Sequence, residues 1–526
     1  MPNILVQFAD VIKGCFTAFD RMMFRGRIMP LCTDSGATSY ALNGTRVLFK
    51  DWKGYSEKIT GEIISHAEKT CAGLGRPFIN LDTQEERDRK KESKEARARE
   101  CLEESPLPDG CELICVLSAV ENGKVAKLKG RGSGKLSLGL SNGRCKYLYY
   151  YFVHKKYGFM YAKVMTWFPF TMETCINGRE ALKKDFENAG IAYETYDNCF
   201  TDISDVEKVQ SISDAFASED HSAEFEKIAG FVNPFYGTVK SQAGEGYSWF
   251  IQQSEVATDI MFVDSERLQN IYSSIVEFAI NCFSCKDVFR FMGKKSANGY
   301  QGEVKSSLRE RPQGIRWKAC MKSNSIKVYD KPGVLRVETT INNAREFKEK
   351  KGVFNEAGEF VKWQWVPMRK GISGMPRRLE VGRASNNRLV GELDGIIPRG
   401  DAIKGMEKVN ARTVVNGRSV AGLNLMDAAT YSILKLVASE DYAVQGFRNK
   451  DIAPRAFPGM EDGRKRSAKT SRLIRKLRDH GLLSKVSRSS RRLVSKNGRM
   501  IISSLIQMKE VMFPMAVEQA KVMSED

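Results

Sequence analysis

Two acidic residues in the middle of the chain, Glu255 and Asp259, stand four positions apart. If this segment is helical, the spacing puts both carboxylates on one face, where they can hold a divalent metal ion. Metal-dependent nucleases use two or three such carboxylates to bind Mg²⁺ and to activate water. Glu303 and Glu338 lie in the β-rich stretch that follows and can complete the set. The residues predict a Mg²⁺ or Mn²⁺ site on Glu255, Asp259 and Glu303 and no other cofactor. The alternative is that these acids are surface groups or salt-bridge partners.

A second candidate site is the polar face of a strand pair around Pro332-Gly333, a dipeptide that suits the centre of a tight turn. A two-residue loop pairs Tyr329 with Arg336 and Lys327 with Glu338. A phenol beside two cations ionises more readily and can attack a phosphodiester. Tyr329 is therefore a candidate nucleophile, and a cross-strand ion pair beside a surface tyrosine is the alternative. The reverse face is predicted to be apolar, with Ile326, Val328, Leu335 and Val337.

The same strand pair carries a resemblance to a known family. Lys-Val-Tyr-Asp-Lys followed by Leu-Arg-Val-Glu, within residues 325–339, resembles a strand pair of rolling-circle replication initiators of plasmids and phages. The resemblance implies an activity that cleaves a DNA strand. The chain has 4 histidines, no two of them within a few residues of each other. The paired-histidine motif of the best-known initiators is therefore absent.

A third candidate site is a run of basic residues near the C-terminus. Between Arg464 and Arg499 the sequence holds 14 lysines and arginines against a single acid, Asp479. A helix at 467–480 buries one apolar stripe and leaves its other faces polar. Six residues on those faces are predicted to contact nucleic acid: Lys469, Thr470, Arg472, Arg475, Lys476 and Arg478. This excess of positive charge is more than solubility requires and indicates double-stranded DNA as the partner.

The elements around this run follow one another in a recognisable order. Helices are expected at 425–438, 450–453 and 467–480, strands at 482–486 and 492–495, and a last helix at 499–510. This order resembles the winged helix-turn-helix of MarR-like regulators. The resemblance implies that helix 467–480 enters the major groove, and that Arg488, Arg491 and Arg492 on the wing reach phosphates or the minor groove. The alternative is a winged helix that contacts protein.

Composition narrows the classes of function. Lys and Arg number 83 against 64 acids, which leaves a net charge of +19 in 526 residues and favours a polyanionic partner. No apolar run approaches the roughly 18 residues that suggest a membrane span, and the first residues lack the pattern of a secretion signal. We therefore expect no membrane partner and a cytoplasmic location, where the 12 cysteines stay reduced.

The length exceeds one ordinary core, and the patterns predict an α+β protein with several domains. We expect an N-terminal α/β segment at 1–110 and a central α+β domain with an antiparallel sheet at 111–345. A connector at 346–422, irregular except for one helix at 377–393, and a winged-helix nucleic-acid-binding domain at 423–526 follow. The central domain includes an aromatic hairpin with strands at 147–153 and 159–166. Helices are expected in it at 179–189, 205–216, 222–231 and 265–282.

Together these features predict a DNA-processing protein of mobile-element or plasmid type, namely a nuclease, transposase or replication initiator. In this interpretation the C-terminal domain finds the site, and a metal- or tyrosine-dependent centre cleaves a phosphodiester. The chain is far longer than a simple regulator needs. One alternative is a non-enzymatic winged-helix transcriptional regulator that senses a ligand. Another is an RNA-binding protein, which the aromatic hairpin suits. A homodimer is compatible with each interpretation, and the target sequence is left open.

Overall fold

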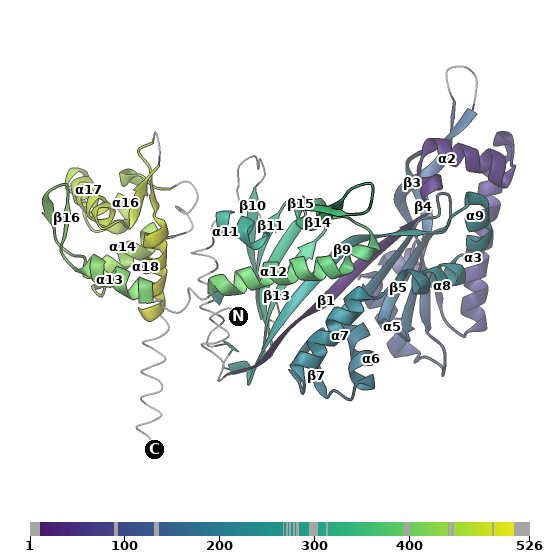
Figure 1. Cartoon of the computed structure of the whole chain (residues 1–526), viewed down its shortest axis with the longest axis horizontal. Coiled ribbons are helices and arrows are strands. Elements are labelled where there is room, and N and C mark those ends of the chain that lie inside the picture. The colour runs from purple at the N-terminus through teal and green to yellow at the C-terminus, as the bar shows by residue number, and fades with distance from the viewer. Residues whose placement is uncertain are drawn as a thin grey trace. The chain divides into compact units, whose positions relative to one another are not determined.

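The computed structural model describes residues 11–88, 93–130, 136–266, 285–293, 303–311, 314–393, 400–439, 446–486 and 489–509, and the positions 268, 269, 272, 275, 276, 279, 283 and 442. The fold is mixed α+β, as the sequence predicted (Figure 1). The chain divides into two compact units. The first unit is Phe16–Thr258 with Glu338–Arg383, and the second is Met1–Cys15, Asp259–Val337 and Ala384–Asp526. The helix expected at 265–282 lies largely outside the described residues.

The largest element is an 11-stranded sheet. Its strands are β1 (Ile12–Arg27), β2 (Phe78–Asn80), β3 (Leu113–Gly130), β4 (Leu136–His154), β5 (Gly158–Met165), β6 (Met172–Asn177), β9 (Ser248–Phe262), β10 (Val304–Arg311), β11 (Gly314–Met321), β12 (Asn324–Lys331) and β13 (Val334–Ile341). Their order is β10-β11-β12-β13-β9-β1-β6-β5-β4-β3-β2. The pair β2–β3 is parallel, whereas β3–β4, β4–β5 and β5–β6 are antiparallel. The sheet as a whole is mixed because β2, which lies before the predicted central domain, pairs in parallel with β3, whereas the pairs just named within 111–345 are antiparallel as predicted. A helical crossover between β2 and β3 returns the chain in the same direction.

Helices pack on both faces of the strands of the first unit (Figure 1). They are α2 (Asp34–Ser39), α3 (Trp52–Gly73), α4 (Gln84–Asp88), α5 (Lys94–Glu104), α6 (Gly178–Asn188), α7 (Val206–Ser218), α8 (Ser222–Val232) and α9 (Tyr236–Ala243). A short hairpin, β7 (Tyr193–Tyr196) and β8 (Cys199–Ile203), follows α6. The predicted helices at 179–189, 205–216 and 222–231 match α6, α7 and α8. Asn177 caps α6, and Asp205 caps α7, through side-chain oxygens that accept backbone N–H groups.

The aromatic hairpin of β4 and β5 is part of the core. Lys94 of α5 lies over the ring of Tyr149, on one face of β4, at 4.8 Å from the centroid. Phe231 of α8 contacts Phe152, on the opposite face, with ring centroids 6.0 Å apart. Since helices cover both faces, successive aromatic residues of β4 are all buried. The β4 rings therefore form core and cross-strand pairs, the usual role of aromatic strands, rather than a surface for stacking bases.

Strands β12 and β13 are joined by the tight turn that the sequence predicted. β12 ends at Lys331 and β13 begins at Val334, so Pro332 and Gly333 form the loop, and Gly333 has a φ of 72°. The predicted reverse face is buried, with Ile326, Val328, Leu335 and Val337 at 1% exposure or less. Every residue of β13 is buried, including the polar positions Arg336 and Glu338.

The C-terminal part of the second unit has its own apolar core. Its elements are α13 (Gly400–Asn410), β16 (Thr413–Val415), β17 (Arg418–Val420), α14 (Ala428–Val437), α16 (Asn449–Ala456), α17 (Gly463–Asp479), β18 (Leu483–Lys485), β19 (Arg492–Val494) and α18 (Lys496–Gln507). Leu434, Phe447 and Leu477 are fully buried members of this core. The helix expected from 425 begins later, at Ala428, because the Asp427 side chain accepts the capping hydrogen bond from the Thr430 N–H.

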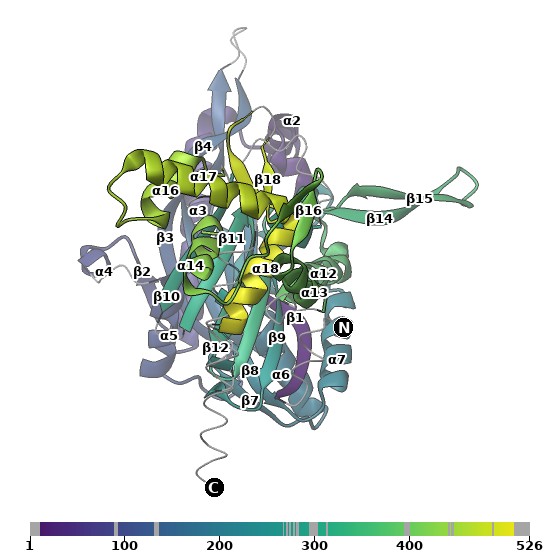
Figure 2. The ribbon, with the colours of Figure 1, turned by 90° about the vertical axis from the view of Figure 1, so that its left-hand side faces the viewer.

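The segment that we expected to be an irregular connector is folded. It begins with a hairpin of β14 (Lys348–Phe354) and β15 (Phe360–Pro367), which pair with each other as a separate two-stranded sheet. Figure 2 shows this hairpin as an extended arm. The helix predicted at 377–393 is α12 (Met375–Leu393). It packs closely on β9, because a Cβ on Gly382 would lie 2.5 Å from the Cβ of Val256.

Candidate metal centre and nucleic-acid interface

Three carboxylates meet on neighbouring strands of the sheet. Asp20 of β1, Glu255 of β9 and Glu338 of β13 each offer a ligand oxygen within 4.8 Å of the other two. All three residues belong to the first unit. Asp20 and Glu338 are buried, at 6% and 2% exposure, and Glu255 is half-buried. Among the described residues this is the group of acids, histidines and cysteines whose geometry can hold a metal ion.

The pairing of β1 with β9 brings Asp20 to Glu255. The hydroxyls of Thr17 and Thr258 are hydrogen-bonded at 2.9 Å. Farther along, a Cβ on Gly26 would lie 2.9 Å from the Trp249 ring. Residue numbers rise along β1 and fall along β9 by the same amount between these two contacts. The strands are therefore antiparallel, and Asp20 stands across from Glu255 on the same face of the sheet.

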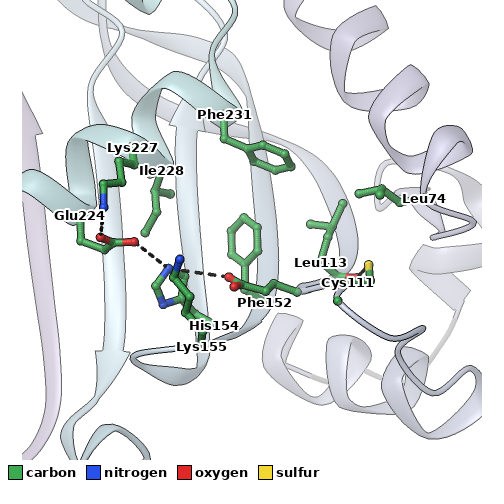
Figure 3. Close-up of a pocket in the computed structure, with 12 residues that line it drawn as sticks. Leu74, Cys111, Leu113, Phe152, His154, Lys155, Glu224, Lys227, Ile228 and Phe231 are labelled. Atoms are coloured by element: carbon green, nitrogen blue, oxygen red, sulfur yellow. Dashed lines mark hydrogen bonds and ion pairs between the residues drawn. The ribbon is translucent and has the colours of Figure 1, made fainter.

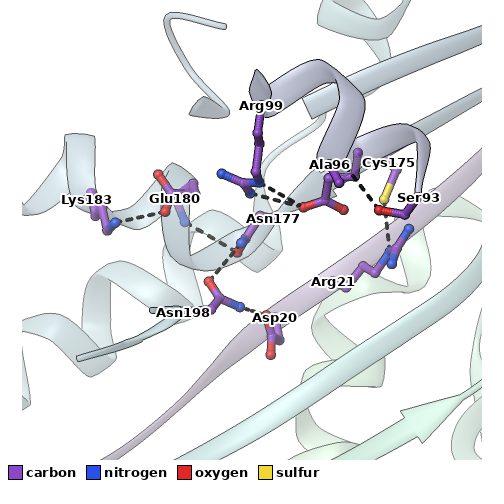
Figure 4. Close-up of polar contacts among 11 residues, drawn as sticks. Asp20, Arg21, Ser93, Ala96, Arg99, Cys175, Asn177, Glu180, Lys183 and Asn198 are labelled. Atoms are coloured by element: carbon purple, nitrogen blue, oxygen red, sulfur yellow. Dashed lines mark hydrogen bonds and ion pairs between the residues drawn. The ribbon is translucent and has the colours of Figure 1, made fainter. Parts of the chain in front are cut away.

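Neutral hydrogen-bond donors orient each carboxylate. The Asn198 side-chain amide donates to Asp20 Oδ1, and Asn177 Nδ2 donates to Asn198 Oδ1 at 2.8 Å (Figure 4). Asn177 is in turn fixed as the N-cap of α6. Gln253 Nε2 donates to Glu255 Oε1 at 2.9 Å, and the Thr340 hydroxyl donates to Glu338 Oε1 at 3.4 Å. These donors hold the carboxylate oxygens in place.

The chemistry of this donor set fits a hard divalent cation. Carboxylate oxygens are the ligands that Mg²⁺ and Mn²⁺ prefer in proteins. Three carboxylates at this separation repel one another, more strongly where burial removes water. A bound cation would offset that repulsion. It would also leave coordination positions for water or a phosphate oxygen on the side of Glu255, the member that solvent reaches.

Asp259 does not belong to this group. The predicted helix at Glu255 and Asp259 is wrong, because both residues lie in strand β9. Four residues along a strand span about 13 Å, too far for one metal ion. Asp259 instead accepts two hydrogen bonds from the Arg336 guanidinium, from Nε at 2.7 Å and from Nη2 at 2.9 Å. It is a structural ion-pair partner.

The two-residue loop at Pro332-Gly333 gives β12 and β13 the predicted register, in which Tyr329 lies across from Arg336. Arg336 also binds Asp259. In the β11–β12 register, Tyr329 lies opposite Arg316, and Lys327 lies opposite Lys318. Lys327 and Tyr329 are half-buried, and Glu303 is exposed at the start of β10.

Asp20 is the member that the sequence reasoning missed. A signal was available, because Asp20 shares one face of its strand with Phe16, Ala18, Met22 and Phe24, which are all apolar. A charged residue at the centre of a buried strand needs partners or a ligand. That signal does not say which distant acids join it. The hydroxyl contact that aligns the two strands joins residues 241 positions apart.

The first unit also contains a pocket of about 380 Å³ beside α8 (Figure 3). Its apolar lining includes Leu74, Leu113, Phe152, Ile228 and Phe231. Its polar lining includes His154, Lys155, Glu112, Glu224 and Lys227. A volume in this range suits a small organic molecule, with a few polar groups to orient it.

His154 lies between two carboxylates in this pocket. Its Nε2 is 3.5 Å from Glu224 Oε1 and 3.8 Å from Glu112 Oε2. The backbone N–H of Lys156 donates to Nδ1 at 3.1 Å, so the neutral ring carries its proton on Nε2, facing the acids. Burial lowers the pKa of His154 despite the two carboxylates. A hydrogen bond from Lys227 lowers the pKa of Glu224.

Helix α17 presents a basic surface. It is capped by Asp462 and buries Thr470, Ile474 and Leu477 on one face. The exposed side carries Lys465, Lys469, Arg472, Arg475 and Arg478. Arg478 hydrogen-bonds Asp479 at 2.8 Å, and Arg475 lies 3.7 Å from the same carboxylate. The predicted helix therefore exists, and it begins four residues earlier than expected because the cap is Asp462.

Several residues predicted to contact nucleic acid also make contacts within the domain. Thr470 is buried, and its hydroxyl donates to the Arg466 carbonyl at 2.9 Å. Lys476 donates to the Gly422 carbonyl at 2.9 Å, and Arg491 donates to the Gly446 carbonyl at 2.8 Å. Arg492 is half-buried on β19. Arg488 lies outside the described residues.

Comparisons with known proteins found no match. No family model matches the chain, and neither a curated protein nor a solved structure does. Among the described residues, no helix has the length and apolar character needed to cross a membrane. The chemistry of the chain therefore has to be argued from its own residues.

Proposed function

We propose that this chain is a divalent-metal-dependent enzyme that cleaves phosphodiester bonds in DNA. The observation that carries the proposal is the convergence of Asp20, Glu255 and Glu338, whose ligand oxygens lie within 4.8 Å of one another. Such a set is suited to Mg²⁺ or Mn²⁺, and these ions support hydrolysis of phosphate esters by polarising the phosphoryl oxygen and the attacking water. The reaction adds water across one P–O bond and leaves a phosphate and a hydroxyl end.

The C-terminal part supplies DNA binding in this proposal. The order of α14, α16, α17, β18, β19 and α18 supports the winged-helix interpretation. The exposed basic side of α17 supports its use as the helix that enters the major groove. The length of the chain and the net charge of +19 agree with a mobile-element or plasmid-type enzyme better than with a small regulator.

A plasmid-cleavage assay tests the proposal. The full chain is incubated with supercoiled plasmid that carries its gene and native flanks, with Mg²⁺, Mn²⁺ or EDTA. We expect nicking or linearisation with either metal and none with EDTA. Asp20→Asn, Glu255→Gln and Glu338→Gln should each lower the rate by at least about 100-fold, because each removes a metal ligand.

Matched controls separate the metal centre from the tyrosine mechanism. Glu303→Gln removes an exposed carboxylate just before β10, and this variant should cleave at the wild-type rate. Tyr329→Phe should also cleave normally. If Tyr329→Phe abolishes cleavage and protease treatment releases a DNA-bound adduct, the tyrosine mechanism replaces the metal one. Wild-type chain that shifts DNA in a gel but never cuts it would contradict the enzymatic proposal.

A ligand-responsive DNA-binding regulator is the second candidate function, and the pocket beside α8 favours it. The pocket combines an apolar body with His154 and two glutamates at one end. This arrangement suits a small molecule with an apolar body and a cationic or hydrogen-bond-donating head. If small-molecule binding at this pocket changes DNA affinity while no strand is cut, the result supports the regulator and assigns the three carboxylates a structural role. His154→Asn should then abolish the response.

A further inference from the structure

The arm formed by β14 and β15 carries an unusual set of exposed aromatic side chains. Trp363 and Trp365 are 59% and 60% exposed, and Phe354 and Phe360 are 61% and 50% exposed. The chain has 6 tryptophans, and the other four, Trp52, Trp167, Trp249 and Trp317, are no more than 9% exposed. Indole rings are normally buried, at least in part, because they are large and mostly apolar. Two exposed ones in a single hairpin indicate a surface that meets another molecule.

The register of the hairpin places these rings on one face. Lys350 is paired with Trp365, and Gly352 with Trp363, so alternate residues of the two strands share a face. The ring centroids of Phe354 and Phe360 are 5.9 Å apart, and those of Phe360 and Trp363 are 5.3 Å apart. The rings form one continuous aromatic face.

Gly352 keeps that face open. A Cβ at this position would lie 3.1 Å from the Phe354 ring and 3.5 Å from the Phe360 ring. The glycine therefore lets both phenyl rings lie against the backbone beside Trp363. Trp363 and Trp365 stand two residues apart on β15, about 7 Å from each other along the strand, so both project from one face.

The charge of this face decides what it can bind. Lys348 and Lys350 lie on the same face as the tryptophans, and Lys350 Nζ lies 5.3 Å from the centroid of the Trp363 ring. The acid of strand β14, Glu349, is on the opposite face. A second copy would bring two lysine-bearing faces together, which like-charge repulsion disfavours. A nucleic acid strand instead offers phosphates to the lysines and unpaired bases to the rings.

We propose that the β14–β15 arm is a stacking platform for single-stranded DNA. Bases of an unpaired strand stack on Trp363, Trp365 and the two phenylalanines, and Lys348 and Lys350 contact the phosphates. Duplex DNA keeps its bases stacked on each other, so it cannot use this face in the same way. The inference rests on the proposed function for the identity of the ligand as DNA. It adds a second binding element that holds an opened strand.

A binding titration with the full chain tests the arm without requiring cleavage. A fluorescent 20-nucleotide oligo(dT) is titrated in EDTA, and anisotropy gives Kd. We expect Trp363→Leu with Trp365→Leu to raise Kd about tenfold or more, since leucine keeps apolar area but cannot stack. Trp363→Phe with Trp365→Phe should stay within about threefold of wild type, because phenylalanine still stacks. Single-stranded DNA should also quench the exposed tryptophan emission of the wild-type chain.

The controls distinguish the possible failures. Lys351→Ala with Lys362→Ala lies on the opposite face of the arm and should change Kd less than the leucine pair does. Equal binding by the leucine pair and wild type would overturn the proposal. So would tighter binding of an RNA oligomer, or a change in sedimentation mass that reveals a second copy on the arm. If arm variants lose binding while the wild-type chain never cuts plasmid, the arm stands and the metal-centre proposal fails. If the wild-type chain cuts plasmid and the leucine variant of the arm binds oligo(dT) with the wild-type Kd, the metal-centre proposal stands and the arm proposal fails.

Discussion

Arg336 of β13 donates two parallel hydrogen bonds to Asp259 of β9, from Nε at 2.7 Å and from Nη2 at 2.9 Å. Both side chains are buried, at 1% and 0% exposure. Paired charges out of water are tolerated only when the geometry satisfies both groups. This pair accounts for two polar residues that the sequence suggested as catalytic, and it joins two of the strands that carry the acidic group.

The first prediction concerns this ion pair. Asp259→Ala removes the carboxylate that accepts two hydrogen bonds from the buried Arg336 guanidinium, and Arg336→Ala removes the donor of those two bonds. Each should lower the free energy of unfolding by about 3–5 kcal/mol. The double variant Asp259→Leu with Arg336→Met should cost less than either single change, because no charge stays unpaired. Urea unfolding measures all three, and equal stability of the single variants and wild type would contradict the structural role.

The second prediction concerns metal binding by Asp20, Glu255 and Glu338. A metal that binds only the folded state stabilises it by about 2.7 kcal/mol when its concentration is 100 times Kd. We expect Mn²⁺ to raise the Tm of the wild-type chain and of Glu303→Gln. Asp20→Asn and Glu338→Gln should lose this increase. Without metal their Tm should equal or exceed that of wild type, because one of three repelling charges is gone. A Mn²⁺ effect that persists in both variants would exclude this site.

The third prediction concerns acid sensitivity. Burial lowers the pKa of His154 and of His221, whose Nδ1 accepts a hydrogen bond from the Tyr157 hydroxyl at 3.0 Å. The unfolded chain therefore takes up protons near the ordinary pKa of about 6.5, while the folded chain does not. Stability should be full above that pH and fall as the pH drops toward 5. His154→Asn should lose part of this dependence in Tm measured from pH 8 to 5. Parallel curves for the variant and wild type would contradict the assignment.

The fourth prediction concerns duplex DNA and α17. Replacing Arg472, Arg475 and Arg478 by alanine should weaken duplex binding by orders of magnitude and reduce the salt slope by about three. Arg472→Ala should account for much of the loss, because Asp479 contacts the other two. Thr470→Val, on the buried face, should leave affinity and salt slope unchanged. Gel shifts across a salt series measure both, and a Thr470→Val effect as large as that of Arg472→Ala would contradict the helix orientation.

Local features of this protein could be predicted from sequence alone. The turn at Pro332-Gly333, the helices α6, α7 and α8, and the basic helix α17 follow from caps, turn residues and apolar periodicity within a few positions. Glu255 and Glu338 were also identified as candidate metal ligands. The β14–β15 arm was not predicted, because apolar residues in a sequence pattern are normally assigned to a buried face. The aromatic residues of this hairpin are exposed instead.

Which acids meet was decided only by the tertiary structure. Glu255 and Asp259 are only four positions apart in the sequence, yet the extended backbone of β9 holds them about 13 Å apart. Each therefore contacts different residues. Asp20 reaches Glu255 because β1 and β9 pair, as the contact between Thr17 and Thr258 across 241 positions shows. Sequence periodicity reports only which face of its own strand a residue occupies. The strand that lies beside it depends on long-range pairing, which is stabilised by burial over the whole sheet and leaves no local signal.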